Sequence, residues 1–183
     1  RTKSVALADF VSEEDFMKEY SYVKNLQANK TEQHYLRGTN EYETRMFSEG
    51  YLETLGSLNI PDVKFGIDND RQLLIETTGK WINSMHTEVP ILKIVNGLYY
   101  RKILKGMSRM KRESIYAEGI RRLYETLESI KEHPNTFFAD FSNRRTPNPL
   151  WHAFVVERAV DELGKQFKGT SKVSLASDNG VTP

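Results

Sequence analysis

The residues of this sequence that are best suited to binding chemistry follow a short apolar segment that begins at Phe137. The adjacent pair Arg144 and Arg145 comes shortly after this segment. Planar guanidinium groups are suited to bidentate capture of a carboxylate or a phosphate. The ring of Phe141, beside these cations, could stack on a flat ligand, so that ring and cation together would hold an aromatic acid. The pattern therefore predicts an anion site. The alternatives are a surface ion pair of the arginines with Asp140 or with Glu157, and core packing of the phenylalanine.

A second group of candidate residues is the run Gly169, Thr170 and Ser171. Glycine lets the backbone approach a ligand closely, and the two hydroxyl groups can donate or accept hydrogen bonds. An equally good interpretation is a helix cap, with Ser171 capping a short helix that starts near Lys172.

The elements around these candidates predict a β-turn-α-β unit over residues 137–171. An apolar strand, a polar turn with the two arginines and an amphipathic helix are followed by a strand that ends in Gly169-Thr170-Ser171. Two strands joined by a helix run parallel. Since ligands of such folds sit at the carboxyl ends of the strands, we expect the arginine turn and Ser171 to meet at one edge of a sheet.

The preceding residues predict helices with one β-hairpin. The expected elements are a strand in 1–10, a helix from Ser12 to about Ala28, a short helix capped at 31–34 and ending at 37–38, a helix over 43–55, a hairpin of 63–68 with 72–79, a helix over 91–104 that is buried nearly all round, and a long surface helix over 108–132. This order predicts an α+β domain over 1–133 and a β/α domain over 134–183, although a boundary near Met107 would also fit.

Composition narrows the function classes. The chain has 183 residues, and a formal net charge of +1 with interspersed acids and bases argues against a nucleic-acid binder. The absence of cysteine excludes a disulfide framework, a thiolate nucleophile and a thiolate zinc site, and favours a reducing, cytoplasmic location. No apolar run has the length of a membrane span, and no signal peptide is recognisable.

Metal and phosphate motifs are also missing from the sequence. The four histidines show no ligand spacing, so we predict no metal site and expect structural or exposed side chains at His34, His86, His133 and His152. The sequence has no glycine-rich phosphate loop and no nucleophile elbow. A first residue other than methionine and an end at the turn Asn179-Gly180 lead us to expect a fragment.

Three blocks of sequence together resemble the nicotinate phosphoribosyltransferase family. They are LLIETTGKWINSMHTEVPILKIVNGLYYR, DFSNRR and FKGTSKVSLASDNGVTP, and their order and spacing match that family. The opening RTKSVALADF is also similar to the family's early strand. The resemblance spans essentially the whole chain, and its specificity lies in the combination of the blocks.

The resemblance implies a fold and a reaction. The expected fold is α/β: an α+β N-terminal domain followed by the first β/α units of an irregular α/β barrel of the type II phosphoribosyltransferases. The expected reaction, in NAD salvage, joins nicotinate to phosphoribosyl pyrophosphate, giving nicotinate mononucleotide and pyrophosphate with ATP hydrolysis. Mg²⁺ would serve the pyrophosphate, and a homodimer would share the active site at the barrel mouth.

The resemblance also implies roles for single residues. Phe141 is similar to the aromatic residue that stacks on the pyridine ring, and Arg144 to the catalytic arginine beside that ring and the phosphates. Arg145 would be a second anion contact. The substrate-binding set is completed by Gly169, Thr170 and Ser171. Ser171 matches the position where nicotinamide-using relatives carry an acid, and a hydroxyl there would not repel a carboxylate, which favours nicotinate.

Two departures from the family pattern bear on these expectations. Ser142 replaces the glycine of the usual Asp-Phe-Gly-X-Arg, so the turn geometry could differ. The chain also holds about two β/α units where a barrel has eight, and the family's N-terminal tyrosine segment, its phosphorylatable histidine and its later magnesium and phosphate residues have no counterpart. We therefore expect this chain alone to be inactive. The alternatives are a catalytically silent binding module, or a nicotinamide or quinolinate phosphoribosyltransferase.

Overall fold

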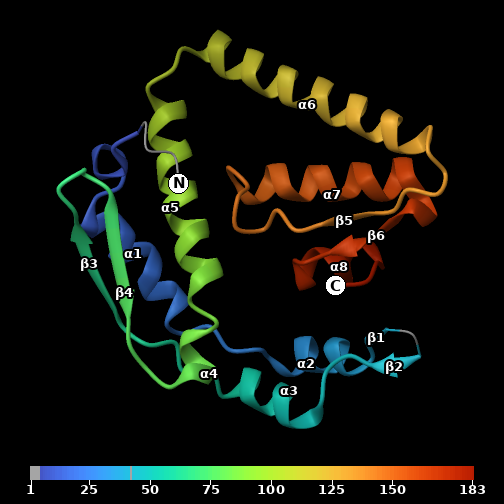
Figure 1. Ribbon diagram of the computed structural model, residues 1–183, viewed down its shortest axis with the longest axis horizontal. Coiled ribbons are helices and arrows are strands. Elements are labelled where there is room, and N and C mark those ends of the chain that lie inside the picture. Colours follow the sequence, from blue (N-terminus) through green and yellow to red (C-terminus); the bar gives the residue numbers. More distant parts are fainter. Residues whose placement is uncertain (1–4, 42) are drawn as a thin grey trace. The chain divides into compact units, whose positions relative to one another are not determined.

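The computed structural model describes residues 5–41 and 43–183 of the chain (Figure 1). These residues form two compact units, Arg1–Tyr99 and Tyr100–Pro183. The domain boundary expected after residue 133 falls inside the second unit. That boundary stays a prediction for the domains of the complete protein.

Short capped helices make up much of the first unit. Its helical elements are η1 (Leu7–Asp9), α1 (Glu13–Val23), α2 (Lys30–Arg37), α3 (Glu49–Gly56), α4 (Trp81–Ser84) and most of α5 (Glu88–Lys105). The Ser12 side chain accepts a hydrogen bond from the Asp15 amide and caps α1 as predicted, but α1 ends at Val23 rather than near Ala28. Helix α2 is capped at Asn29, two residues before the expected cap at Thr31, because Asn29 and Glu32 form a capping box.

Two antiparallel hairpins complete the first unit. Strands β3 (Val63–Ile67) and β4 (Leu73–Thr77) pair as predicted, with Val63 opposite Thr77. The turn between them is closed by the Asp68 carboxylate, which accepts hydrogen bonds from the Asp70 and Gln72 amides.

The second hairpin was not predicted. Strand β1 (Asn40–Glu41) pairs with β2 (Thr44–Arg45). Strand β2 occupies the start of the expected helix 43–55, and the helix begins only after the Ser48 cap. The expected strand in 1–10 is also wrong for residues 5–10, which contain the 3-10 turn η1, while residues 1–4 lie outside the described residues.

The core of the first unit joins α1 to the β3–β4 hairpin and to α5. Its buried members are Val11, Phe16, Tyr20, Val23, Leu58, Ile60, Val63 and Leu98. The hydroxyl of Tyr20 donates to the Pro61 carbonyl at 2.7 Å, so this buried polar group is satisfied. The prediction that α5 is buried nearly all round is wrong, because among its described residues only Leu98 is buried. Ile91, Ile94 and Val95 are partly exposed although they pack against this core.

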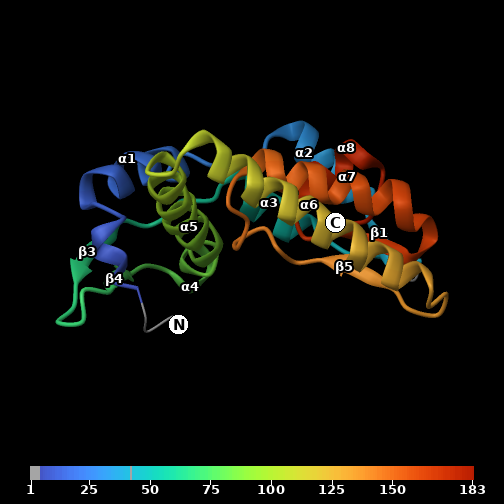
Figure 2. The same ribbon diagram turned by 90° about the horizontal axis from the view of Figure 1, so that it is seen from above.

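The second unit is a β/α arrangement beside a long helix. It contains α6 (Arg109–Lys131), β5 (Phe138–Asp140), α7 (Pro149–Leu163), η2 (Gly164–Gln166), β6 (Phe167–Thr170) and α8 (Val173–Asn179). Strands β5 and β6 pair in parallel, as predicted, and Gly169 forms a further parallel bridge to Thr182. Helices α6 and α7 lie side by side (Figures 1 and 2). The buried core of the unit is Leu127, Val156, Ala159, Leu163, Phe167 and Leu175.

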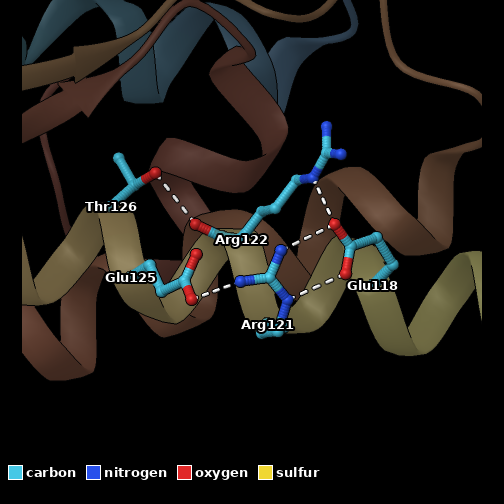
Figure 3. A network of polar contacts seen from close by, with 5 residues as sticks. All are labelled: Glu118, Arg121, Arg122, Glu125 and Thr126. Atoms are coloured by element: carbon cyan, nitrogen blue, oxygen red, sulfur yellow. Dashed lines mark hydrogen bonds and ion pairs between the residues drawn. The ribbon is translucent and has the colours of Figure 1, made fainter.

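Helix α6 carries an exposed network of charges on its outer surface (Figure 3). Arg121 lies between two carboxylates: it donates to Glu118 at 2.7 Å and also pairs with Glu125. Arg122 donates to Glu118 as well, at 2.6 Å. Hydrogen bonds from Arg121 and Arg122 lower the pKa of Glu118 to about 2. The expected surface helix over 108–132 is thus confirmed.

The fold class is mixed, with an incomplete barrel. Each of the three sheets in residues 5–41 and 43–183 has two strands, and no barrel closes within that part of the chain. None of its helices is both long and apolar enough to cross a lipid bilayer.

Candidate substrate-binding site

The carboxyl ends of β5 and β6 lie next to each other, and this brings the two groups of candidate residues together. In the register of the parallel pair, Asp140 is opposite Thr170. The amide of Ser171 then donates to the Asp140 carbonyl at 2.8 Å. The arginine turn starts directly after β5, so it and Ser171 extend from the same edge of the sheet, as the sequence predicts.

A tight turn over residues 142–145 carries the arginines. The amide of Arg145 donates to the Ser142 carbonyl at 2.7 Å, which closes the turn. Ser142 also donates its amide, at 3.0 Å, and its hydroxyl, at 2.5 Å, to Oδ1 of Asp140. Among the described non-glycine residues, only Glu43 and Arg71 have a positive φ. Serine at position 142 is therefore free of the strain that a left-handed conformation would impose.

The side chains beyond the strand ends differ in exposure. Phe141 is 78% exposed, so its ring is not part of the core of its unit. Arg144 is half-buried, whereas Arg145 and Ser171 are exposed. A face made of an exposed ring, guanidinium groups and a hydroxyl can receive a flat, anionic ligand. The substrate-binding roles of these residues stay predictions.

The Asp140 carboxylate lies beneath this face and is 4% exposed. Its Oδ2 accepts hydrogen bonds at 2.6 Å from Nε2 of His152 and at 2.6 Å from the hydroxyl of Thr170. Its Oδ1 is bound by Ser142. The predicted alternative of a surface ion pair between Asp140 and the arginines is therefore wrong, because this carboxylate is buried and its hydrogen bonds come from other residues.

Burial and hydrogen bonding have opposite effects on the pKa of Asp140. Burial alone would raise it, because a charged carboxylate is poorly solvated in the interior. The hydrogen bonds from His152, Ser142 and Thr170 outweigh burial and hold the pKa of this carboxyl well below its usual range. Asp140 is thus an anion that only accepts hydrogen bonds.

His152 is the residue of this site that sequence reasoning missed. It is 1% exposed, so the expectation of a structural or exposed histidine is met in its structural form, but its bond to Asp140 was not foreseen. The signal that could have found it is the period of α7. The buried residues of this helix recur at helical spacing and are His152, Val156, Ala159 and Leu163. A histidine that continues such a face needs a polar partner in the sheet.

The run from Gly169 to Ser171 serves the packing of the strands more than the sequence suggests. Gly169 has a φ of +146°, and a Cβ there would lie 1.9 Å from the Thr182 carbonyl oxygen. The space left by the missing side chain is therefore filled by the backbone of Thr182 in the same chain rather than open to a ligand. Thr170 is 2% exposed, and its hydroxyl is bound to Asp140. The predicted cap at Ser171 is wrong, because Lys172 occupies the N-cap of α8 and no side chain caps it.

The described site does not fit Mg²⁺. The ion prefers several oxygen ligands around an octahedron. Asp140 is the only acid in the segment from Phe138 to Lys172 that lies at the strand ends, and its carboxylate already accepts four hydrogen bonds. Within residues 5–41 and 43–183, no three His, Asp or Glu side chains gather as a metal site.

A separate hollow of about 410 Å³ lies between α6 and the start of α7. It is lined by Tyr116, Ile120, Asn148, Leu150, Trp151 and Phe154. Because none of these side chains is charged, the hollow lacks the groups that would bind an anion. The edge formed by β5 and β6 therefore remains the candidate site.

Comparison with known proteins gives a family and a fold. Residues 3–96 match the family described as the nicotinate phosphoribosyltransferase (NAPRTase) N-terminal domain. The structure is similar to that of nicotinate phosphoribosyltransferase from Vibrio cholerae, with a TM-score of 0.72 and 18% identity over 100% of this chain and 42% of that chain. It is also similar to that of nicotinate phosphoribosyltransferase from Porphyromonas gingivalis, with a TM-score of 0.58 and 20% identity over 96% of this chain and 51% of that one. The chain thus spans about half the length of these structures or less, and at such identities the likeness shows the fold.

Proposed function

This chain belongs to the nicotinate phosphoribosyltransferase family, and on that basis we propose that it supplies part of the substrate pocket of an enzyme that transfers phosphoribose to nicotinate. The observation that carries the proposal is the shared edge of β5 and β6. There an exposed aromatic ring, two arginines and the exposed Ser171 follow two strand ends that are hydrogen-bonded to each other.

Each candidate side chain suits one part of the substrates. The exposed ring of Phe141 offers a face on which a pyridine ring can stack. The half-buried Arg144 would lie beside that ring and neutralise the charge of the phosphates. Arg145 and Ser171 are exposed and would contact the anionic groups of the ligand. Ser171 adds no negative charge of its own, which favours a carboxylate over an amide on the pyridine ring.

The proposed reaction forms one bond and breaks one bond at the anomeric carbon of the ribose. The pyridine nitrogen of nicotinate attacks this carbon while its bond to pyrophosphate breaks, and the bonding electrons leave with the pyrophosphate. The protein forms no covalent bond to the sugar. Its contribution is to hold the ring nitrogen near the anomeric carbon and to stabilise the charge that develops on the leaving group. Arg144 is the residue to which we assign that stabilisation.

The proposal extends to the complete protein in three respects that rest on family membership. Mg²⁺ and ATP would take part through residues other than those of the β5–β6 edge, which does not fit the metal. The enzyme would be a homodimer in which a second subunit completes each pocket, and it would act in the cytoplasm in NAD salvage.

The proposal is tested by the activity of the complete protein that contains this chain. With nicotinate, phosphoribosyl pyrophosphate, ATP and Mg²⁺, we expect nicotinate mononucleotide, measured by liquid chromatography. Arg144→Ala should lower kcat/KM by about two to three orders of magnitude, as the loss of one charge-stabilising donor does in other enzymes.

The matched control is Arg122→Ala, which removes an exposed arginine from α6 in the same unit. We expect near wild-type rates for this variant. Unchanged steady-state kinetics in Arg144→Ala would remove Arg144 from the pocket. A complete protein that makes no mononucleotide from nicotinate, nicotinamide or quinolinate would instead indicate a silent binding module.

A further inference from the structure

Asp140 joins three separate parts of the second unit through one side chain. Oδ1 accepts two hydrogen bonds from Ser142, in the arginine turn. Oδ2 accepts one from His152, on α7, and one from Thr170, at the end of β6. The backbone carbonyl of the same residue accepts from the Ser171 amide at 2.8 Å. The arginine turn and the end of β6, which form the two sides of the proposed pocket, are therefore both hydrogen-bonded to Asp140.

These hydrogen bonds indicate that Asp140 does not itself contact a ligand. An ionised carboxylate offers about four acceptor positions, and four donors of the protein occupy them here. The side chain is also only 5% exposed. Hydrogen bonds between buried polar groups hold the elements that they join in a fixed arrangement.

His152 holds the network on the side of α7. Its Nε2 donates to Asp140 at 2.6 Å, because a carboxylate can only accept. Its Nδ1 is buried and has no hydrogen-bond partner. The polar contribution of His152 to the structure is therefore the single bond from Nε2, and a side chain that supplies only that donor should replace it.

We propose that Asp140 and His152 form a positioning pair that sets the geometry of the arginine turn relative to Ser171. The pair fixes the turn through Ser142 and the end of β6 through Thr170. It thereby holds the ring of Phe141 and the guanidinium of Arg144 in place for the nicotinate ring. The functional part of this inference rests on the proposed function, whereas the structural part concerns the chain alone.

The structural part is tested by amide hydrogen exchange, measured by NMR on the 183-residue chain. The amide of Ser142 donates to Asp140 at 3.0 Å, so its exchange rate reports directly on the hydrogen bond between the arginine turn and Asp140. His152→Asn removes the donor from the position of Nε2 but keeps a polar side chain, and we expect exchange at Ser142 to become faster by about tenfold. His152→Gln places an amide donor about as far from the backbone as Nε2, and it should retain most of the protection.

The functional part is tested in the complete protein by separating KM from kcat. We expect His152→Asn to raise KM for nicotinate by about tenfold, with a smaller change in KM for phosphoribosyl pyrophosphate. His152→Gln should restore most of the nicotinate affinity. Ser142→Ala removes the half-buried hydroxyl that donates to Asp140 at 2.5 Å. It should raise the same KM several-fold with a melting temperature close to that of the wild type, and it decides the question if His152→Asn does not fold.

Two results would overturn the positioning role. One is an unchanged nicotinate KM in both His152→Asn and Ser142→Ala. The other is equal loss in His152→Gln and His152→Asn, which would indicate that the shape of the ring, and not its hydrogen bond, is what matters. If the wild-type complete protein transfers no phosphoribose, the proposed function fails, and the exchange rates at Ser142 still decide whether the pair holds the turn.

Discussion

Ser171 lies at the end of β6, exposed, with its amide bound to the Asp140 carbonyl at 2.8 Å. Its backbone is thus fixed while its side chain remains accessible. Under the proposed function, the charge of this side chain would distinguish a pyridine carboxylate from a pyridine amide, because an acid repels the first and accepts a hydrogen bond from the second.

We therefore predict that Ser171→Asp shifts preference from nicotinate toward nicotinamide. The expected change in the ratio of the two kcat/KM values is about tenfold or more, since like charges in contact cost more than 1.4 kcal/mol. Competition between the two substrates in the complete protein measures it. Ser171→Asn, which carries no charge, is the matched control and should shift the ratio less. An unchanged ratio in Ser171→Asp would place this residue outside the pocket.

Gly169 illustrates a requirement for glycine that is set by a neighbouring backbone segment of the same chain. Its φ of +146° disfavours any side chain, and the carbonyl of Thr182 lies where a Cβ would be. Gly180 also has a positive φ, +65°, but nothing lies within 4 Å of its Cβ position. A side chain would therefore clash with other atoms at Gly169 but not at Gly180.

We predict that Gly169→Ala lowers the free energy of unfolding of the second unit by about 3 kcal/mol or more, because strain and a clash with the backbone add. Gly180→Ala should cost only about 1 kcal/mol, the cost of the left-handed conformation. Urea denaturation followed by the fluorescence of Trp151 measures both, in a Trp81→Phe background that leaves one tryptophan. Equal losses in the two variants would show that the contact with Thr182 does not limit this position.

At the scale of elements, α6 combines a charged outer surface with one deeply buried contact. Its network of Glu118, Arg121, Arg122 and Glu125 is exposed (Figure 3). Exposed ion pairs are screened by water and salt and contribute little to stability. Leu127, on the same helix, is 2% exposed and belongs to the core formed with α7 and β6. Packing of that leucine should therefore hold α6 in place.

We predict that Leu127→Ala lowers the free energy of unfolding of the second unit by about 3 kcal/mol, from lost burial and the cavity left behind. Arg121→Ala, six positions earlier on the same helix, should leave the urea midpoint almost unchanged. The same Trp151 fluorescence measurement compares the two variants. A larger loss in Arg121→Ala than in Leu127→Ala would contradict the view that packing, rather than surface charge, holds α6.

At the scale of the whole molecule, the described residues contain the beginning of a barrel. Strand β6 is flanked by β5 on one side and by the bridge to Thr182 on the other. Parallel strands that follow one another around a barrel pair in this way. A barrel mouth, by contrast, requires loops from strands all around the ring, and those described here supply one edge of it.

We predict that the 183-residue chain alone produces no nicotinate mononucleotide from nicotinate, phosphoribosyl pyrophosphate and ATP. The reason is that the unclosed sheet leaves strand edges unpaired and would supply only one side of the proposed pocket. Mass spectrometry of the reaction mixture detects the product, and the complete protein under the same conditions is the positive control. Turnover by the chain at a rate comparable to the complete protein would refute this expectation.

Much of this structure follows from local rules that the sequence alone expresses. The cap at Ser12, the hairpin around Asp68 and the parallel pairing of the two strands in residues 137–171 were all predicted. Capping, turn chemistry and the direction of a strand-helix-strand unit depend on residues close together in the chain. For the same reason, the arginine turn and Ser171 could be placed at one edge before the structure was known.

The tertiary structure alone decided which side chains hold that edge together. The bond between His152 and Asp140, the buried hydroxyl of Thr170 and the approach of Thr182 to Gly169 join residues of different elements. A local pattern can indicate that His152 is buried, but it does not give the partner of such a residue, because that depends on how a helix packs on a sheet and on which strands become neighbours. The sequence by itself thus predicted an anion site at this edge, and the fold decided which residues hold the arginine turn and the end of β6 in place.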